Sequence, residues 1–276
     1  MKINRLFTIA AAALMMVACS SEETAPNNNN PAVGSQMQFT ATISAPNSGA
    51  TTRTEYTESG TDIKVAWEVG DEIALFHYGV KDVATVTAVN ADGSATISAI
   101  IKDVKDGEAV EVCYPAELWD WDENAEGPIR NAKFVANIIA QDGTLKYIQD
   151  NLDFRMGEGE LKVDGDKVTL NADVKLESQI AIWKLTLQDD AETPAALAAT
   201  QVILKVNDPA ATIARTTTLS KTSTVYLALD MINEEDLTIE ATVGEDTYVY
   251  TQNGVTLAHG NYYQSTVTMT KILSGQ

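Results

Sequence analysis

"MQFTATIS", residues 37–44, is the stretch that decides the fold class, because it alternates apolar and polar residues without a break. Successive side chains of a β-strand point to opposite faces, so a period of two predicts a strand with one face buried. The polar positions would face solvent. The apolar face carries Met37, Phe39, Ala41 and Ile43.

Short runs of the same kind recur to the end of the chain, separated by Gly, Asp and Asn. "ADG" at residues 91–93, between two alternating runs, predicts a hairpin. Helical spacing is scarce, and the exceptions we identify are "TLKYIQDNLDF" (144–154) and "TPAALAATQ" (193–201). This pattern predicts an all-β protein with antiparallel sheets and one or two short helices. The strands are too many for one small sandwich, so we expect two tandem β-sandwich domains, residues 37–172 and 173–276.

The first residues have the form of an export signal. Lys2 and Arg5 precede an apolar run, residues 6–17, that is too short to span a bilayer. The run ends in "LMMVAC", which resembles a bacterial lipobox and implies removal of residues 1–18 and lipidation of Cys19. The alternative is an ordinary signal with an incidental cysteine. Residues 19–36 are rich in Asn, Ser and Pro and are expected to form a flexible tether.

Charge and composition limit the partners. The 276 residues include 19 Lys and Arg against 39 Asp and Glu, giving a formal net charge of -20. Such a charge repels nucleic acid and anionic lipid. Cys113 lies in a strand-like run and is expected to be a small buried hydrophobe, with no redox role.

Residues that could carry catalysis are scarce. His77 and His259 are the only histidines, and no H-E-x-x-H or G-x-S-x-G motif accompanies them. We therefore expect no enzyme and no cofactor, with a carboxylate glycosidase as a distant alternative.

A candidate ligand loop is "WDWDENAEG" (119–127), whose oxygens suit calcium poorly because the glycine is misplaced and no distal Glu follows. Its rings could stack on a sugar or pack under a loop. The loop residues are Trp119, Asp120, Trp121 and Asp122.

Several motifs, taken in order, resemble the fimbrillin family, the Mfa-like pilins of type V pili in Bacteroidales-type bacteria. They cover the mature chain, from the lipobox with its following Glu22 and Glu23 to the closing strand. The motifs are "MQFTATI" (37–43), "TTRTEY" (51–56), "WEVGDEIALF" (67–76), "VCYPAEL" (112–118) and "LAHGNYYQSTVTMT" (257–270). The most specific positions are Trp67, Gly70, Asp71, residues 73–76, Gly260, Tyr262 and Tyr263.

The resemblance implies two transthyretin-like sandwiches and a precursor that carries a fatty acyl group, such as palmitate, in the outer membrane. It also implies that an arginine-specific protease cuts the surface-exposed precursor between Arg53 and Thr54. Removal of the first strand, residues 37–46, would leave a groove for a strand of another subunit, which is donor-strand exchange. Arg130, Arg155 and Arg215 compete as cut sites. We expect the removable strand at a sheet edge; a strand that lies loose on the outside, or that is locked centrally between two neighbours, would contradict assembly by exchange.

Two questions stay open from the sequence. If residues 266–273 form an internal strand, the subunit accepts a strand without donating one, which would place it at the adhesive tip of an extracellular pilus; otherwise the tail from Tyr262 could be the donor. The alternative function is a permanently anchored surface lipoprotein that binds a glycan or a protein, with Arg53 an ordinary loop residue.

Overall fold

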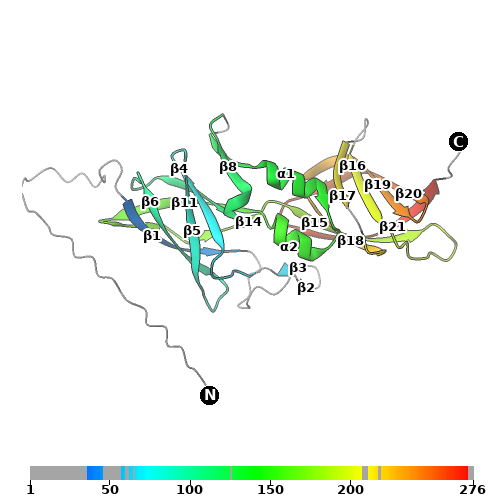
Figure 1. The fold of residues 1–276 in the computed structure, drawn as a ribbon, viewed down its shortest axis with the longest axis horizontal. Helices are drawn as coiled ribbons and strands as arrows, with labels where there is room; N and C mark the ends of the chain where they lie inside the picture. The colour runs from blue at the N-terminus through cyan, green and yellow to red at the C-terminus, as the bar shows by residue number, and fades with distance from the viewer. Residues whose placement is uncertain are drawn as a thin grey trace, which may run out of the picture.

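The computed structural model describes residues 36–45, 57–59, 62–64, 66–124, 126–206, 211–216 and 219–272. Figure 1 shows two β-rich bodies side by side along the long axis of the molecule, with two short helices between them. The predicted all-β class is confirmed. Cys19, Arg53 and Thr54 lie outside the described residues, as do the signal, most of the tether and the loop after the first strand.

The first body is a nine-stranded sheet in the order β12-β1-β6-β5-β4-β7-β11-β14, with β13 also on β1. Because β12 pairs with both β1 and β11, the sheet closes on itself around one apolar core. The bounds are β1 Gln36–Ser44, β4 Glu72–His77, β5 Val80–Val89, β6 Ala95–Lys102, β7 Ala109–Tyr114, β11 Arg155–Asp164, β12 Lys167–Leu170, β13 Val174–Lys175 and β14 Glu177–Ser178.

Strand β1 lies inside this sheet, so the expected edge position is wrong. It runs antiparallel to β6 on one side and parallel to β12 and β13 on the other. The alternation of residues 37–44 correctly predicts that one face of β1 is buried. It does not indicate which strands pair with β1, or whether β1 has one neighbouring strand or two. The parallel pairs also depart from the predicted antiparallel sheets, because β1 meets strands that follow it far along the chain.

The second body is an eight-stranded sheet in the order β10-β17-β16-β19-β20-β21-β15-β18. Here β15 and β21 pair in parallel over eight registered positions, and the remaining long strands are antiparallel. The bounds are β10 Ala140–Gln141, β15 Ala181–Asp189, β16 Gln201–Val206, β17 Ala211–Thr216, β18 Thr224–Leu229, β19 Ile232–Val243, β20 Asp246–Leu257 and β21 Tyr262–Ile272.

Besides the two sheets, the described residues form two small hairpins and a short 3-10 helix. They are β2 Thr57–Ser59 with β3 Asp62–Lys64, β8 Trp119–Asp122 with β9 Gly127–Arg130, and η1 Ala116–Leu118. The hairpin predicted at residues 91–93 is confirmed, because the turn at Asn90–Ser94 joins β5 to β6. The Asp92 carboxylate accepts hydrogen bonds from the amide and hydroxyl of Ser94, which lower its pKa.

The two α-helices lie where the two bodies meet. The helix predicted at 144–154 is confirmed as α2 (Leu145–Leu152), capped by the Thr144 hydroxyl. Helix α1 (Ala132–Ile139) was not predicted, although Asn131 caps it. The helical turn predicted at 193–201 is wrong, because residues 193–200 are irregular apart from bridges at Ala196 and Ala199, and Gln201 begins β16.

The chain changes from the first sheet to the second between β14 and β15, since β13 and β14 still belong to the first sheet. The predicted boundary at residue 172 falls between β12 and β13. Strand β10 already pairs with β17 of the second sheet, so the two bodies are interleaved in sequence. The division into two domains stays a prediction.

Gln141 of β10 ties the helices to the edge strand β18. It is fully buried, and its amide nitrogen donates to the carbonyl oxygens of Ile138 and Ala228, each at 2.7 Å. Its amide oxygen accepts from the Ala228 amide at 2.9 Å. One side chain therefore satisfies three backbone groups that would otherwise be buried without these partners.

Gln141→Leu is expected to lower the free energy of unfolding by about 2 to 4 kcal/mol, because a leucine cannot replace these hydrogen bonds. Chemical denaturation measures the change. Gln38→Leu, on the exposed face of β1, is the matched control and should change stability by less than about 0.5 kcal/mol. Equal effects of the two substitutions would contradict this role for Gln141.

Candidate strand-acceptor site

The slot is the space in the first sheet that β1 fills. The four side chains predicted for its inner face are buried: Met37 is 3% exposed, Phe39 0%, Ala41 8% and Ile43 0%. They belong to the apolar core of the first sheet, together with side chains of β4, β5, β6 and β7. Sequence reasoning thus identified the correct face. The structure adds that the slot has strands on both sides.

The two sides hold β1 unequally. Strand β6 pairs with it over eight consecutive positions, from Gln36 with Lys102 to Ile43 with Ala95. On the other side β12 pairs at two positions, Gln38 and Phe39, and β13 pairs at two more, Ile43 and Ser44. No described strand is registered with residues 40–42 on that side. The slot is continuous along β6 and interrupted along its other wall.

The motif residues Trp67, Gly70 and Asp71 build the turn that leads into β4. Trp67 is buried and meets the ring of Tyr114 edge-on at 5.1 Å. The Asp71 carboxylate accepts from the Glu68 amide at 2.9 Å and from the Tyr114 hydroxyl at 3.5 Å. Gly70 has φ +102°, a conformation that other residues rarely adopt. The motif therefore has a structural role in the first sheet.

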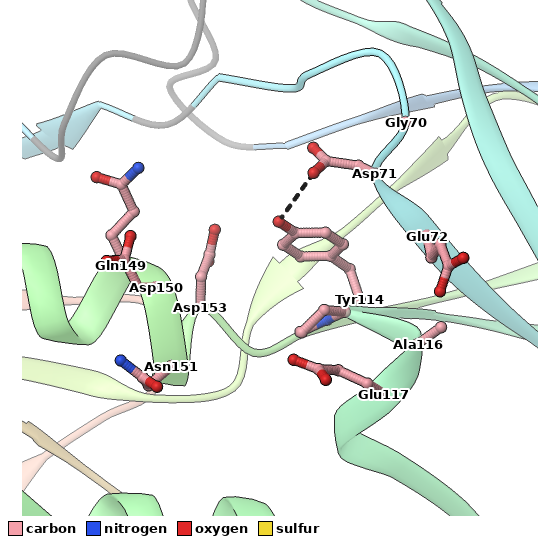
Figure 2. A pocket seen from close by; sticks show the side chains of 11 residues that line it. Gly70, Asp71, Glu72, Tyr114, Ala116, Glu117, Gln149, Asp150, Asn151 and Asp153 are labelled. Atoms are coloured by element: carbon pink, nitrogen blue, oxygen red, sulfur yellow. Dashed lines mark hydrogen bonds between the residues drawn. The ribbon is translucent and has the colours of Figure 1, made fainter.

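A pocket of about 260 Å³ lies beside this turn (Figure 2). Carboxylate side chains from the β4 turn, η1 and the end of α2 line it. No group of His, Cys, Asp and Glu among the described residues has the arrangement of a metal site. The acidic lining residues are Asp71, Glu72, Glu117, Asp150 and Asp153.

The candidate ligand loop forms β8 and the turn after it. Trp119 is 3% exposed, its ring stacks on Phe154 at 3.8 Å, and its indole nitrogen donates to the Tyr114 carbonyl oxygen at 3.2 Å. The suggestion that Trp119 stacks on a sugar is therefore wrong, because a neighbouring ring already covers it. Trp121 is half-buried and stacks on Phe76 at 6.1 Å.

The polar members of the same loop serve the hairpin turn or face solvent. The Asp122 carboxylate accepts from the amide of Asn124 at 2.8 Å, which closes the turn between β8 and β9. Asp120 is exposed on β8. The loop is thus a packed hairpin, and its tryptophans anchor it to the junction between the bodies.

His77 is buried at the end of β4 between two carboxylates. Its Nε2 lies 2.9 Å from Asp82 Oδ2, and its Nδ1 lies 3.7 Å from Glu108 Oε1. These contacts link the β4–β5 hairpin to the start of β7.

Cys113 is buried on β7. Burial raises the pKa of its thiol far above the usual range, the charge of Glu111 raises it further, and the charge of Lys81 opposes the shift.

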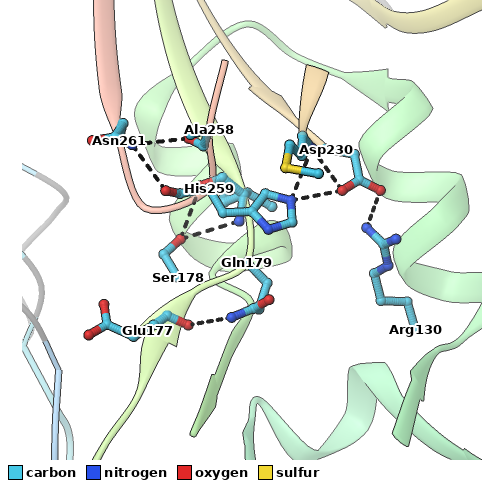
Figure 3. Close-up of polar contacts among 10 residues, drawn as sticks. Arg130, Glu177, Ser178, Gln179, Asp230, Ala258, His259 and Asn261 are labelled. Carbon is cyan, nitrogen blue, oxygen red and sulfur yellow. Dashed lines mark hydrogen bonds and ion pairs between the residues drawn. The ribbon is translucent and has the colours of Figure 1, made fainter. Parts of the chain in front are cut away.

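His259 belongs to a polar cluster between the bodies (Figure 3). Asp230, just after β18, lies 2.9 Å from His259 Nε2 and pairs with Arg130 at the end of β9. Burial raises the pKa of Asp230, but the hydrogen bonds with His259 and the Met231 amide and the charge of Arg130 outweigh it, so the pKa falls below its usual value. The cluster joins the β8–β9 hairpin to the second sheet.

A groove of about 580 Å³ runs along α1 beside this cluster, and the sequence analysis did not identify it. Val135 and Ile139 of α1 line it and are 47% and 42% exposed. The four apolar residues at Phe134, Val135, Ile138 and Ile139 have helical spacing, which was the available signal for α1 and its exposed face.

The competing arginines differ in accessibility. Arg155 is 4% exposed, and its Nε lies 2.7 Å from the carboxylate of Asp153. Arg130 is paired with Asp230, and only Arg215 of the three is an exposed strand residue. A protease needs an extended, accessible backbone, so Arg155 in β11 is a poor cut site.

Glu111 of β7 lies directly opposite Glu158 of β11. Burial raises the pKa of Glu111 above its ordinary value of 4.5, and the Glu158 charge raises it further. The folded protein therefore holds this proton more tightly than the unfolded chain. The resulting stabilisation is present below pH 4.5 and is lost as the pH rises through the folded-state pKa.

Glu111→Gln is accordingly expected to stabilise the protein at pH 7 by up to about 1 kcal/mol, because it removes a like-charge pair across two strands. The gain should shrink as the pH falls toward 4.5. Thermal unfolding of both proteins over a pH series measures it. Glu123→Gln, at an exposed turn, is the control and should show no such trend. A gain that is constant with pH would contradict the assignment.

Comparison with known proteins gives likeness in structure alone. No family model matches the chain, and no curated protein matches it in sequence. A solved structure from Bacteroides ovatus, named for cell adhesion, is 14% identical, with a TM-score of 0.49, and the match covers 87% of this chain and 96% of that one. A fimbrial assembly protein from Parabacteroides distasonis is 15% identical, with a TM-score of 0.39 and coverages of 86% and 92%. A fimbrial protein from Bacteroides ovatus is 14% identical, with a TM-score of 0.39 and coverages of 86% and 49%.

Proposed function

We propose that this protein is a non-enzymatic subunit of a cell-surface pilus, structural or adhesive, that is exported as a lipoprotein and assembled by strand exchange. The observation that carries the proposal is β1: a strand near the amino end whose four inward side chains are built into the core of the first sheet. The names of the structurally similar proteins concern the same role, but the proposal rests on the slot.

Departure of β1 would expose an apolar core and unpaired backbone groups, and another strand could cover both. Burial of Met37, Phe39 and Ile43 contributes roughly 5 to 9 kcal/mol, comparable with the net stability of a domain. An edge strand would leave one row of backbone groups without partners, whereas β1 would leave two, on β6 and on β12 with β13. The internal position of β1 counts against exchange, because its release must break backbone pairs on both sides. Exchange is proposed because the vacated slot would expose an apolar core and two rows of backbone groups that an incoming strand can satisfy.

The closing strand is not free to be exchanged in this structure. β21 pairs with β15 over eight positions and with β20 over three, and its Val267 and Met269 are in the core of the second sheet. Releasing β21 would open that core. This favours a subunit that accepts a strand in its first body over one that donates β21.

Processing in the loop after β1 is the second part of the proposal. A cut between Arg53 and Thr54 separates β1 from the rest of the chain while leaving every other strand attached. Residues 19–53, which include the acylated Cys19 and β1, would then stay with the membrane when the rest of the protein leaves. No described helix meets the length and hydropathy needed to cross a membrane.

The proposal predicts that limited digestion with an arginine-specific protease cuts first after Arg53, and that the cut protein takes up a synthetic peptide of residues 36–45. Intact-mass analysis identifies the cut, and fluorescence anisotropy of the labelled peptide measures uptake. The expected product is a complex in which the peptide replaces β1. If the cut protein takes up no peptide, strand exchange is wrong for this chain.

Two controls match this experiment. A peptide in which Phe39 and Ile43 are replaced by serine keeps the backbone but loses the buried side chains, so it should bind at least about tenfold more weakly. Arg53→Ala should leave the protein uncut and without uptake. Cutting elsewhere, with Arg53 intact, would contradict the assigned processing site.

A second candidate function is a permanently anchored lipoprotein that binds a protein or glycan at its surface. The exposed aliphatic side chains along the α1 groove favour it, since contiguous apolar surface marks interaction sites. Mass analysis of assembled surface material separates the two candidates: a mature start at Thr54 supports the pilus subunit, and lipid-bearing Cys19 throughout supports the anchored protein.

A further inference from the structure

Strand β1 must separate from the strands on both sides before it can leave the slot. These two walls of the slot, β6 on one side and β12 with β13 on the other, hold β1 differently. The β6 wall consists of consecutive antiparallel pairs inside the sheet. The other wall consists of two short parallel contacts separated by a gap opposite residues 40–42. Opening the second wall breaks fewer hydrogen bonds, so that wall is the candidate exit.

The carboxyl-terminal half of that wall is a short segment, residues 171–176, that we call the strap. It follows β12 and contains β13, which pairs with β1 and with no other described strand. Its first three residues are exposed, whereas Val174 and Leu176 are buried in the core. The Leu176 amide donates to the Ser44 carbonyl oxygen at 2.7 Å, so the strap also holds the end of β1.

The strap rests on two glycines of β11. A Cβ at Gly157 would lie 2.5 Å from the Lys175 carbonyl oxygen and 2.7 Å from Val174 Cγ1. A Cβ at Gly159 would lie 2.8 Å from Val174 Cγ2. Neither glycine has a positive φ, so the backbone conformation alone does not require glycine there. The absence of side chains is what lets the strap approach β11 and reach β1.

The strap is fixed to β11 near each end, by one backbone hydrogen bond at its start and by the pairs of β14 with β11 directly after it. The Asn171 amide donates to the Glu160 carbonyl oxygen at 2.8 Å, and beyond the strap the Gln179 amide donates to the Phe154 carbonyl oxygen at 2.8 Å. Between these points it is held by Val174, Leu176 and its pairing with β1. It can therefore lift from the glycines while β11 keeps its pairs with β7 and β12.

We propose that the strap is the gate of the slot: lifting it frees the carboxyl-terminal end of β1, which then separates from β12 and β6, and an incoming strand enters by the same route while β6 keeps its place beside β5. Closure of the strap over the new strand then completes the second wall. The proposal rests on strand exchange as the proposed function and adds the route that the strand takes. Gly157 and Gly159 determine how firmly the gate closes.

Hydrogen exchange of the full, uncut chain tests the gate without any exchange of strands. Gly159→Ala is expected to speed exchange by about tenfold in both residues 36–45 and residues 171–176, with the β5–β6 hairpin unchanged. Gly254→Ala, a strained substitution in the second sheet with nothing within 4 Å of the added Cβ, is the control and should leave both segments unchanged. Faster exchange in the strap alone would overturn the gate.

A reversible lock tests the gate in the cut protein, and it decides the matter if Gly159→Ala does not fold. The Asn171 amide donates to the Glu160 carbonyl oxygen, so Glu160→Cys with Asn171→Cys can form a disulfide that ties the start of the strap to β11 and leaves β1 free. Thr85→Cys with Ser98→Cys, a registered pair of β5 and β6, is the matched control. Both are made with Cys19→Ser, and Cys113 is buried.

The oxidised lock is expected to abolish uptake of the 36–45 peptide after cleavage at Arg53, and a reductant should restore it. The control disulfide should leave uptake unchanged. Release of β1 and full uptake with the lock closed would overturn the gate while leaving strand exchange standing. Coupled hydrogen exchange in the uncut chain, without peptide uptake after cleavage, would overturn strand exchange and retain the strap as a local opening unit.

Discussion

The first body depends on one packing constraint, the insertion of the apolar face of β1 into a sheet that closes around it. Met37, Phe39, Ala41 and Ile43 fill the core, and the backbone of β1 completes the walls on both sides. The strand is local in sequence but its partners are not, because β12 and β13 come after α1, α2 and β11. A cut next to β1 would thus break the chain without breaking the fold.

The sequence predicted what depends on local periodicity. The period of two at residues 37–44, the turn at 91–93 and the helix at 144–154 all follow from neighbouring residues, and each is confirmed. The internal place of β1 and its parallel partners depend on chain segments far away, so no local pattern could reveal them. At residues 193–201 local preference was misleading. The alanines there favour a helix, but in the fold Ala196 and Ala199 instead form isolated β-bridges with residues of other segments.

The candidate site was predicted to a similar extent. Its inward side chains could be read from alternation, whereas the wall formed by the strap could not, because it depends on Gly157 and Gly159 admitting residues that follow in the chain. Trp119 was misjudged for the same reason. Its exposure is decided by Phe154, which reaches it only through the tertiary fold. Helix α1 was overlooked although the spacing of Phe134, Val135 and Ile138 indicated it.

The junction between the bodies has a mechanical consequence. One apolar cluster contains side chains of both sheets and both helices, including the ring of Phe154, which stacks on Trp119 and meets Phe134 at a tilt. Bending the molecule at this junction would disrupt the shared cluster, which joins Ile182 and Ala228 of the second sheet to Phe76 and Cys113 of the first. In the proposed pilus, we therefore expect bending at the joints between subunits and not within each subunit.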